Sequence, residues 1–211
     1  MREKPNPFVS ISDLMAGVSA VIMLMLVVMV VRTMVMSAQA ELNQKKGIFY
    51  AIKEISDSLD KGTQNVEVTD RGLTLKDAAF ERGSACLSEK MDSILTQKIA
   101  PILSKKMKEY PNIRVYIEGH TDILPVKNIS TDIKAKCALF DDNYSLSAGR
   151  AREARKAILN AVDNDKEIAQ RIAVVGYASD KLKIKKNPEA AENRRVEIRL
   201  VVQEPEKDDA E

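Results

Sequence analysis

Residues 112–122 read NIRVYIEGHTD, and this stretch decides the fold class of the 211-residue chain. Its first eight residues are predicted to form a strand, and further strands are predicted at 171–177 (RIAVVGY) and 194–202 (RRVEIRLVV). A helix is predicted between the first two strands at 147–162, with Ser147 as its cap. Because helices alternate with strands, the residues predict a two-layer α/β sandwich.

The segment that precedes this stretch supplies a hairpin and a second helix. Residues 65–69 (NVEVT) and 73–75 (LTL) have strand composition, and the tight turn between them at 70–72 (DRG) predicts a β-hairpin. A helix follows at 87–110, where apolar residues recur on one stripe. Pro101 predicts a kink in that helix, since proline lacks the backbone N–H that a helix interior needs.

An apolar run near the N-terminus predicts one membrane span. The 18 residues at 14–31 carry no charge, which is close to the length that crosses a hydrocarbon core. A helix over 7–36 would measure about 45 Å, more than the core thickness of about 30 Å, so it would tilt or protrude. The alternative is a secretory signal, because residues 37–40 (SAQA) have the small-residue spacing of a cleavage site.

An acidic residue, Asp13, lies at the head of this run. An unpaired carboxylate in hydrocarbon costs about 2.5–3.5 kcal/mol, so the residue needs a partner or a function. Small residues follow on the same helix face: Ala16, Gly17 and Ala20. Such a face lets another helix pack closely. The alternative is that Ser10 or Ser12 caps the helix and Asp13 only favours its positive end.

The two cysteines and the single histidine are candidates for structural roles. Cys86 and Cys137 lack metal-like spacing to His120, so they form either a disulfide or two buried free thiols. His120 is expected to make a structural hydrogen bond. No catalytic residue, metal site or cofactor is predicted, because no nucleophile is paired with a base and no ligand cluster is visible. The net charge of +2 and the few, scattered tyrosines and phenylalanines argue against direct nucleic-acid binding.

Four ordered pieces of the sequence resemble the signature of the OmpA-like peptidoglycan-binding domain. They are IEGHTD (117–122), NYSLSAGRA (143–151), VVGYAS (174–179) and ENRRVEI (192–198). The resemblance covers residues 65–203 and implies an OmpA-like sandwich. Two further pieces, AFERGSACLS at 79–88 and LPV at 124–126, are similar to the flagellar stator protein MotB.

The resemblance implies a binding site for the diamino acid of the cell-wall stem peptide. Its two main residues are Asp122 and Arg150, while Asn143 and Leu146 shape the entry from loop to helix. An acid and a guanidinium can hold the ammonium and the carboxylate of such a ligand through charge-assisted hydrogen bonds. Arg194 is instead expected to fix the last strand. The alternative is that Asp122 caps a turn and Arg150 is a solvated helix residue.

The layout of the chain resembles that of a B-type stator subunit of the MotB class. Residues 10–23 (SISDLMAGVSAVIM) are similar to the stator region whose acid takes up the ion, so the resemblance implies that Asp13 carries protons. The short head and the long loop at 123–142 are similar to ZorB of the Zorya anti-phage defence systems. This implies a homodimer, bound to peptidoglycan, with a multi-span ZorA-like or MotA-like membrane partner. A flagellar MotB-type subunit and a passive peptidoglycan anchor are the alternatives.

The expected organisation is that of a single-pass inner-membrane protein with a cytoplasmic N-terminus and a periplasmic C-terminal domain. Its expected segments are a cytoplasmic head at 1–6, a transmembrane helix at 7–36, a periplasmic linker with a helix at 37–64, the domain at 65–203 and a charged tail at 204–211.

Overall fold

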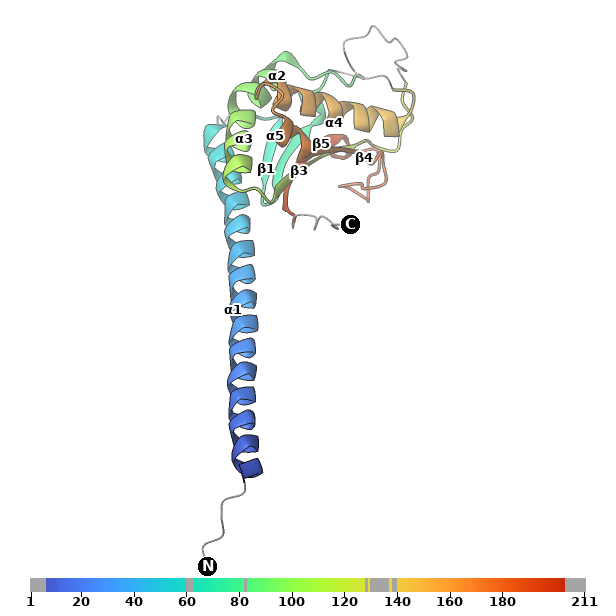
Figure 1. Ribbon diagram of the computed structural model, residues 1–211. Coiled ribbons are helices and arrows are strands. Elements are labelled where there is room, and N and C mark those ends of the chain that lie inside the picture. Colours follow the sequence, from blue (N-terminus) through green and yellow to red (C-terminus); the bar gives the residue numbers. More distant parts are fainter. Residues whose placement is uncertain are drawn as a thin grey trace, which may run out of the picture. The chain divides into compact units, whose positions relative to one another are not determined.

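The computed structural model describes residues 7–59, 63–81, 83–127, 129, 137 and 140–203 (Figure 1). The chain divides into two compact units, of which the first ends at Asn43 and the second begins at Gln44. Helix α1 (Pro7–Ser58) contributes residues to both units. The predicted head at 1–6 and tail at 204–211 lie outside the described residues.

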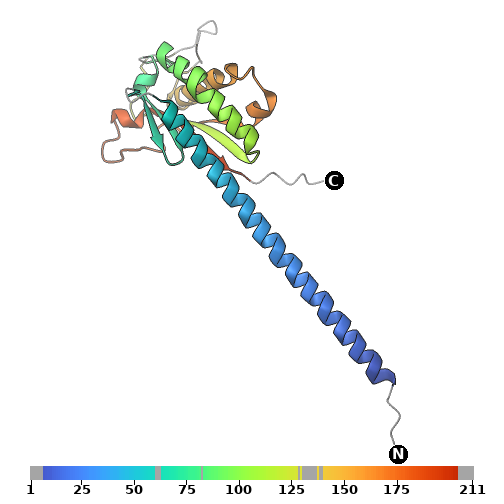
Figure 2. The same cartoon turned by 90° about the vertical axis from the view of Figure 1, so that its left-hand side faces the viewer.

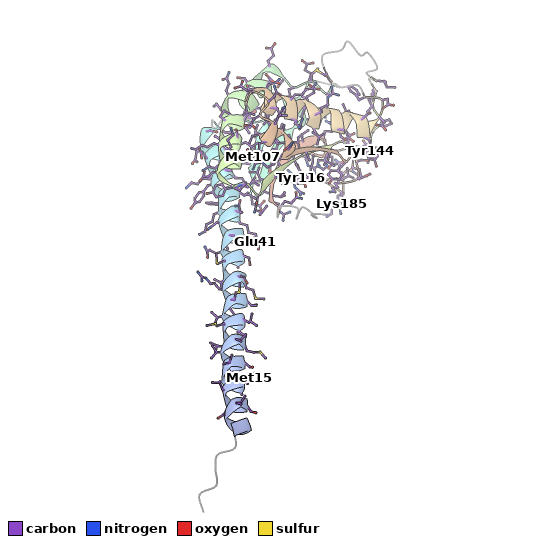
Figure 3. All side chains as sticks on the ribbon, in the orientation of Figure 1. Met15, Glu41, Met107, Tyr116, Tyr144 and Lys185 are labelled. Carbon is purple, nitrogen blue, oxygen red and sulfur yellow. A yellow bond between two sulfur atoms is a disulfide. The ribbon has the colours of Figure 1, made fainter. Side chains whose placement is uncertain are left out.

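In the first unit, α1 is long and apolar enough to cross a membrane. Every side chain from Ile11 to Asn43 is exposed, and Met15, which projects from the helix in Figure 3, is 64% exposed. Exposure of the uncharged, mostly apolar stretch at 14–31 is unfavourable in water. The helix therefore fits a lipid environment, as its composition predicted.

The second unit is built on a five-stranded sheet. Its strands, in spatial order, are β1 (Val66–Thr69), β2 (Gly72–Lys76), β5 (Arg195–Val202), β3 (Ile113–His120) and β4 (Ile172–Gly176). Strands β3 and β4 are parallel, and the other neighbouring pairs are antiparallel. The hairpin predicted from the turn at 70–72 is confirmed, with Thr69 paired to Gly72.

Helices cover one face of the sheet (Figure 2). They are α2 (Glu89–Ile94), α3 (Ala100–Glu109) and α4 (Asn143–Asn160), while the short α5 (Lys166–Gln170) precedes β4. The core between the two layers contains fully or almost fully buried apolar side chains from both, among them Leu73, Leu75, Leu95, Leu103, Ile117, Ile158, Val196 and Ile198. The predicted two-layer α/β sandwich is confirmed.

The helix predicted at 87–110 is interrupted in the middle. A π-helical turn, η2 (Leu95–Ile99), separates α2 from α3, and the amide of Ala100 donates to the carbonyl of Leu95. Pro101 lies in the first turn of α3, directly after the π-helical turn. The irregularity predicted at Pro101 is therefore a π-bulge just before it.

The C-terminal part of α1 packs into the domain. Ala51 and Ile55 have no exposed surface and belong to the core. Gly47 lies against the ring of Tyr110, where a β-carbon would come within 2.5 Å of Cγ. The segment 44–58, expected to be part of a linker, thus extends the core, because its apolar residues meet the domain on one helix face.

Helix α4 begins earlier than the sequence suggested. Asp142 is its N-cap: its carboxylate accepts from the amide of Ser145 at 2.7 Å, and the hydroxyl of Ser145 accepts from the amide of Asp142 at 3.0 Å. The prediction that Ser147 caps the helix is wrong. Ser147 is buried inside the helix, and its hydroxyl accepts from the amide of Ala178 at 3.1 Å, beyond the end of β4. The reciprocal bonds of the capping box explain why Asp142 takes this position.

Candidate functional site

A pocket of about 300 Å³ lies where three neighbouring strands, β2, β5 and β3, end side by side. Three paired residues mark these ends: Lys76, Arg195 and His120. The residues just beyond this row include Asp77, Arg194 and Asp122, and all three line the pocket. The strand register thus brings together charged side chains from three distant parts of the sequence.

Helix α4 supplies another wall of the pocket. Asn143, Leu146 and Arg150 line it, and their spacing of three and four residues places them on one helix face. The helix can lie close to the sheet because Gly119 has no side chain, since a β-carbon there would overlap the carbonyl of Ser147. The glycine of the GHTD piece therefore has a packing role that positions α4.

Four charged side chains alternate in sign along this site. Arg150 Nη1 donates to Asp77 Oδ1 at 3.0 Å. Arg194 donates from Nε to Asp77 Oδ2 at 3.0 Å and from Nη1 to Asp122 Oδ2 at 2.7 Å. The order is Arg150, Asp77, Arg194, Asp122. Among the described residues, no direct hydrogen bond joins Asp122 to Arg150. The two are connected through Arg194 and Asp77.

Arg150 is held as a buried cation. Its side chain is 5% exposed, its Nε donates to the carbonyl of Ser84 at 3.0 Å, and its guanidinium carbon lies 5.1 Å from the ring centroid of Phe80. Burial lowers the pKa of Arg150, and the carboxylate of Asp77 opposes that effect. The alternative, that Arg150 is a solvated helix residue, is therefore wrong, and Arg150 lines the pocket.

Arg194 is a second guanidinium in the pocket. Burial by itself would lower the pKa of Arg194, but its hydrogen bonds to Asp122 and Asp77 outweigh burial, and the net shift is upward. The sequence suggested that Arg194 only fixes the last strand. The structure places Arg194 between two carboxylates in the pocket, whereas its neighbour Asn193 is bonded to the backbone of the loop 184–188.

Asp122 takes part in a turn as well as in the charge network. Its Oδ1 accepts from the amide of Leu124 at 3.1 Å. The side-chain amide of Asn143 donates to the carbonyl of Leu124 at 2.9 Å, so the first residues of α4 hold the same turn. One oxygen of Asp122 therefore caps the turn, as the alternative interpretation expected, and the other pairs with Arg194.

A disulfide ties together two segments at the rim of the pocket. Cys86 and Cys137 are bonded, with their Cα atoms 5.3 Å apart. Next to the bond, Ala85, Phe140 and Leu146 form a small second core against which Cys137 packs. The structure thus contains the disulfide and not the pair of free thiols, and the bond lies beside the pocket-lining face of α4.

Asp77 and Arg194 are the site residues that sequence reasoning missed. Asp77 opens a short helical turn, η1 (Asp77–Ala79), directly after β2, and Arg194 directly precedes β5. The available signals were the position of Arg194 within ENRRVEI and the position of Asp77 just ahead of the piece at 79–88. Neither signal shows that the two side chains meet, because that depends on the pairing of β2 with β5.

His120 lies at the end of β3 and is 1% exposed. The structural hydrogen bond expected for it is not found, since neither ring nitrogen has a partner among the described residues. Its ring stacks on Tyr177, with centroids 5.5 Å apart. Burial first, and then the nearby charge of Arg195, lower the pKa of His120 to about 4. The imidazole is therefore neutral at neutral pH.

Asp13 belongs to the first unit and lies in the second turn of α1, which begins at Pro7. The favourable effect of a helix dipole on an acid falls off within the first turn. This position weakens the interpretation that Asp13 only favours the positive helix end. Ala16, Gly17 and Ala20 are exposed on the same helix, so the small-residue face is available to another helix.

Comparison with known proteins gives two kinds of match. The chain is 30% identical over 122 residues to the flagellar export/assembly protein LafU of Escherichia coli, both in a truncated form from strain K12 and in a form from strain 042. The match covers 58% of this chain and 49% and 34% of those two proteins, so the chain spans about half of their length or less. No family model matches.

Solved structures give the second kind of match. A MotB-like protein from Desulfovibrio vulgaris has a TM-score of 0.53 at 18% identity, over 80% of this chain and 99% of that one. The periplasmic domain of Helicobacter pylori MotB has a TM-score of 0.50 at 24% identity, over 69% of this chain and 84% of that one. The domain has the fold of MotB periplasmic domains. At these identities the likeness establishes the fold alone.

Proposed function

We propose that this chain is a B-type stator subunit of a proton-driven motor in the inner membrane, anchored to peptidoglycan by its C-terminal domain. The observation that carries the proposal is the alternation of Arg150, Asp77, Arg194 and Asp122 in a pocket on a MotB-like fold. The apolar helix with Asp13 supplies the second element that a stator needs. The domain and the helix have separate roles in this proposal.

The pocket suits the free end of a diamino acid, which carries an ammonium group next to a carboxylate. Asp122 and Asp77 would accept hydrogen bonds from the ammonium, while Arg150 and Arg194 would donate to the carboxylate. The four side chains pair with one another in the free protein, so none of these four charges is unpaired before the ligand binds. A volume of about 300 Å³ admits the end of one side chain.

Asp13 is the proposed proton carrier. A carboxyl group can be neutral against an apolar helix surface and ionised where it meets water, which is what a carrier requires. The small residues Ala16, Gly17 and Ala20 would let helices of a multi-span MotA-like or ZorA-like partner, and of a second copy of this chain, approach the acid. In this arrangement the N-terminus is cytoplasmic and the domain periplasmic.

The finer assignment is to ZorB of the Zorya anti-phage defence systems. It is supported by the sequence around Asp13 and by the long loop at 123–142. The match to LafU supports the flagellar alternative, a MotB-type subunit. The genes beside this one distinguish the two: a multi-span partner gene next to a helicase or nuclease gene would support defence, and flagellar genes would overturn that assignment.

Wall binding is tested by sedimenting detergent-solubilised full-length protein with isolated peptidoglycan. Asp122→Asn keeps the shape of the side chain but removes its charge, so a charge-assisted bond worth about 1.5–3 kcal/mol is lost and binding should weaken about tenfold to a hundredfold. Asp57→Asn is the matched control, because Asp57 is exposed on the part of α1 that belongs to the same unit. Equal sedimentation of all three proteins would contradict the proposed site.

A competition experiment tests the ligand chemistry. A free diamino acid that carries a carboxylate beside its distal ammonium should displace the protein from the wall. Lysine whose α-amino and α-carboxyl groups are both blocked, so that an ammonium alone remains, should compete at least tenfold less well, since it offers no carboxylate to Arg150 and Arg194. Equal competition by both compounds would mean that the two arginines do not recognise the carboxylate.

A further inference from the structure

The face of the sheet opposite the helices carries a cluster of ionisable side chains. Glu118 and His120 are two residues apart on β3, so they point to the same face. Glu197 on β5 is the direct cross-strand partner of Glu118. Two acids placed directly opposite each other repel, so this arrangement needs compensating positive charge, part of which Arg195 and Arg199 supply.

Burial makes this requirement stronger. Glu118 is 4% exposed and His120 is 1% exposed. The Nε2 atom of His120 faces the cluster, 3.9 Å from Oε1 of Glu197, which is too far for a hydrogen bond. Neither nitrogen of the ring has a hydrogen-bond partner among the described residues. A neutral imidazole has one donor and one acceptor, and such groups are normally satisfied when buried.

We propose that Glu118, His120 and Glu197 form a binding site for one divalent transition-metal ion, with zinc as its best probe. One ligand atom from each of the three residues lies within 4.8 Å of the other two. Imidazole nitrogen with carboxylate oxygen is a common zinc ligand set, and three protein ligands leave a fourth position for water. Calcium and magnesium prefer oxygen ligands alone. None of the three residues lines the pocket between β3 and α4.

Three cations face the cluster and limit its affinity. Arg195 Nε donates to Glu197 Oε1 at 2.6 Å, and Arg199 Nη1 lies 3.5 Å from Glu118 Oε2. The third cation is Lys181, whose Nζ lies 3.5 Å from the ring centroid of Tyr177. Its charge disfavours protonation of His120 and so lowers the pKa of that residue. A bound dication would share the two carboxylates with these side chains. The site should therefore bind zinc more weakly than a closed structural site of four cysteine or histidine ligands.

The ion can reach the cluster through Glu197. Its side chain is 26% exposed, whereas the side chains of Glu118 and His120 are 5% and 2% exposed. Glu197 is therefore the ligand that links the buried part of the site to solvent. A substitution there disturbs the buried part least, which makes it the most informative variant.

Zinc titration of full-length protein in detergent tests the proposal. The protein must carry no histidine tag, because His120 is the only histidine of the sequence. After treatment with a chelator and its removal, calorimetric titration with zinc chloride should show saturable binding of one ion per chain. The imidazole signals of the single histidine in ¹H–¹⁵N spectra should shift as the site fills.

Three variants assign the binding to the cluster. Glu197→Gln and His120→Gln should each weaken zinc binding at least tenfold. Glu67→Gln should leave it unchanged, because Glu67 lies in the same cross-strand row, beyond Thr74, but outside the cluster. If His120→Gln does not fold, Glu197→Gln decides the question. Absence of saturable binding, or equal affinity in wild type and Glu197→Gln, would overturn the proposal.

Discussion

Asp77 Oδ1 accepts a hydrogen bond from Arg150 Nη1 at 3.0 Å, although the two residues are 73 positions apart in sequence. The other carboxylate oxygen of Asp77 accepts from Nε of Arg194, also at 3.0 Å. One carboxylate therefore holds two guanidiniums that would otherwise repel each other. Since the side chain of Arg150 is only 5% exposed, Asp77 also compensates for the desolvation of that cation.

Removal of this carboxylate should destabilise the domain. Asp77→Ala leaves the buried guanidinium of Arg150 without its counter-charge, which should lower the free energy of unfolding by about 1–3 kcal/mol. Urea titration of the detergent-solubilised chain, followed by circular dichroism, measures the change. Asp57→Ala, at an exposed position, should have little effect. If the two variants unfold at the same urea concentration, Asp77 does not support Arg150 in the way described.

The membrane acid should be essential for ion flow. Asp13→Asn keeps the size of the side chain but cannot release a proton, so the variant should still insert and assemble with its multi-span partner while ion flow and biological activity are lost. Co-purification with the partner and a cellular activity assay measure the two outcomes, with Asp57→Asn as the control. Full activity of Asp13→Asn would favour a passive peptidoglycan anchor.

The disulfide should contribute both stability and site geometry. The bond between Cys86 and Cys137 closes a loop of 51 residues, for which the chain-entropy model gives about 4 kcal/mol at most. The double variant Cys86→Ser, Cys137→Ser should unfold at a lower temperature and bind peptidoglycan more weakly, because the bond lies against Leu146 of the pocket. Unreduced protein should be two hydrogens lighter by mass spectrometry. Rapid alkylation of both thiols in the native protein would show that the bond is absent.

Mild acid should destabilise the fold through His120. Its pKa is about 4 in the folded chain, chiefly because of burial, against 6.5 for an exposed histidine. Between these values the unfolded chain binds the extra proton, so stability is present in full above about pH 6.5 and falls as the pH falls toward 4. With a chelator present, the unfolding temperature of wild type should drop more steeply in this window than that of His120→Gln, whose amide does not titrate. Parallel curves would contradict the prediction.

Elements with a strong local signal could be predicted from the sequence. The hairpin around 70–72, the strand at 112–119 and the apolar helix each depend on composition within a short window, and each is present. Boundaries were less predictable. Helix α4 begins at Asn143 because Asp142 and Ser145 form a capping box. Ser147 therefore lies inside the helix and not at its N-cap.

The sequence by itself determined which chemistry the chain carries: one membrane-length helix with an acid, an α/β domain, and a set of polar residues after β3 and in α4. Only the tertiary structure decided which charges meet. Arg194 and Asp77 are 117 positions apart, and Arg194 and Asp122 are 72 apart. They come together because the pairing of Lys76, Arg195 and His120 aligns the ends of three strands. That alignment depends on burial of the alternate side chains in the core, which no local pattern specifies.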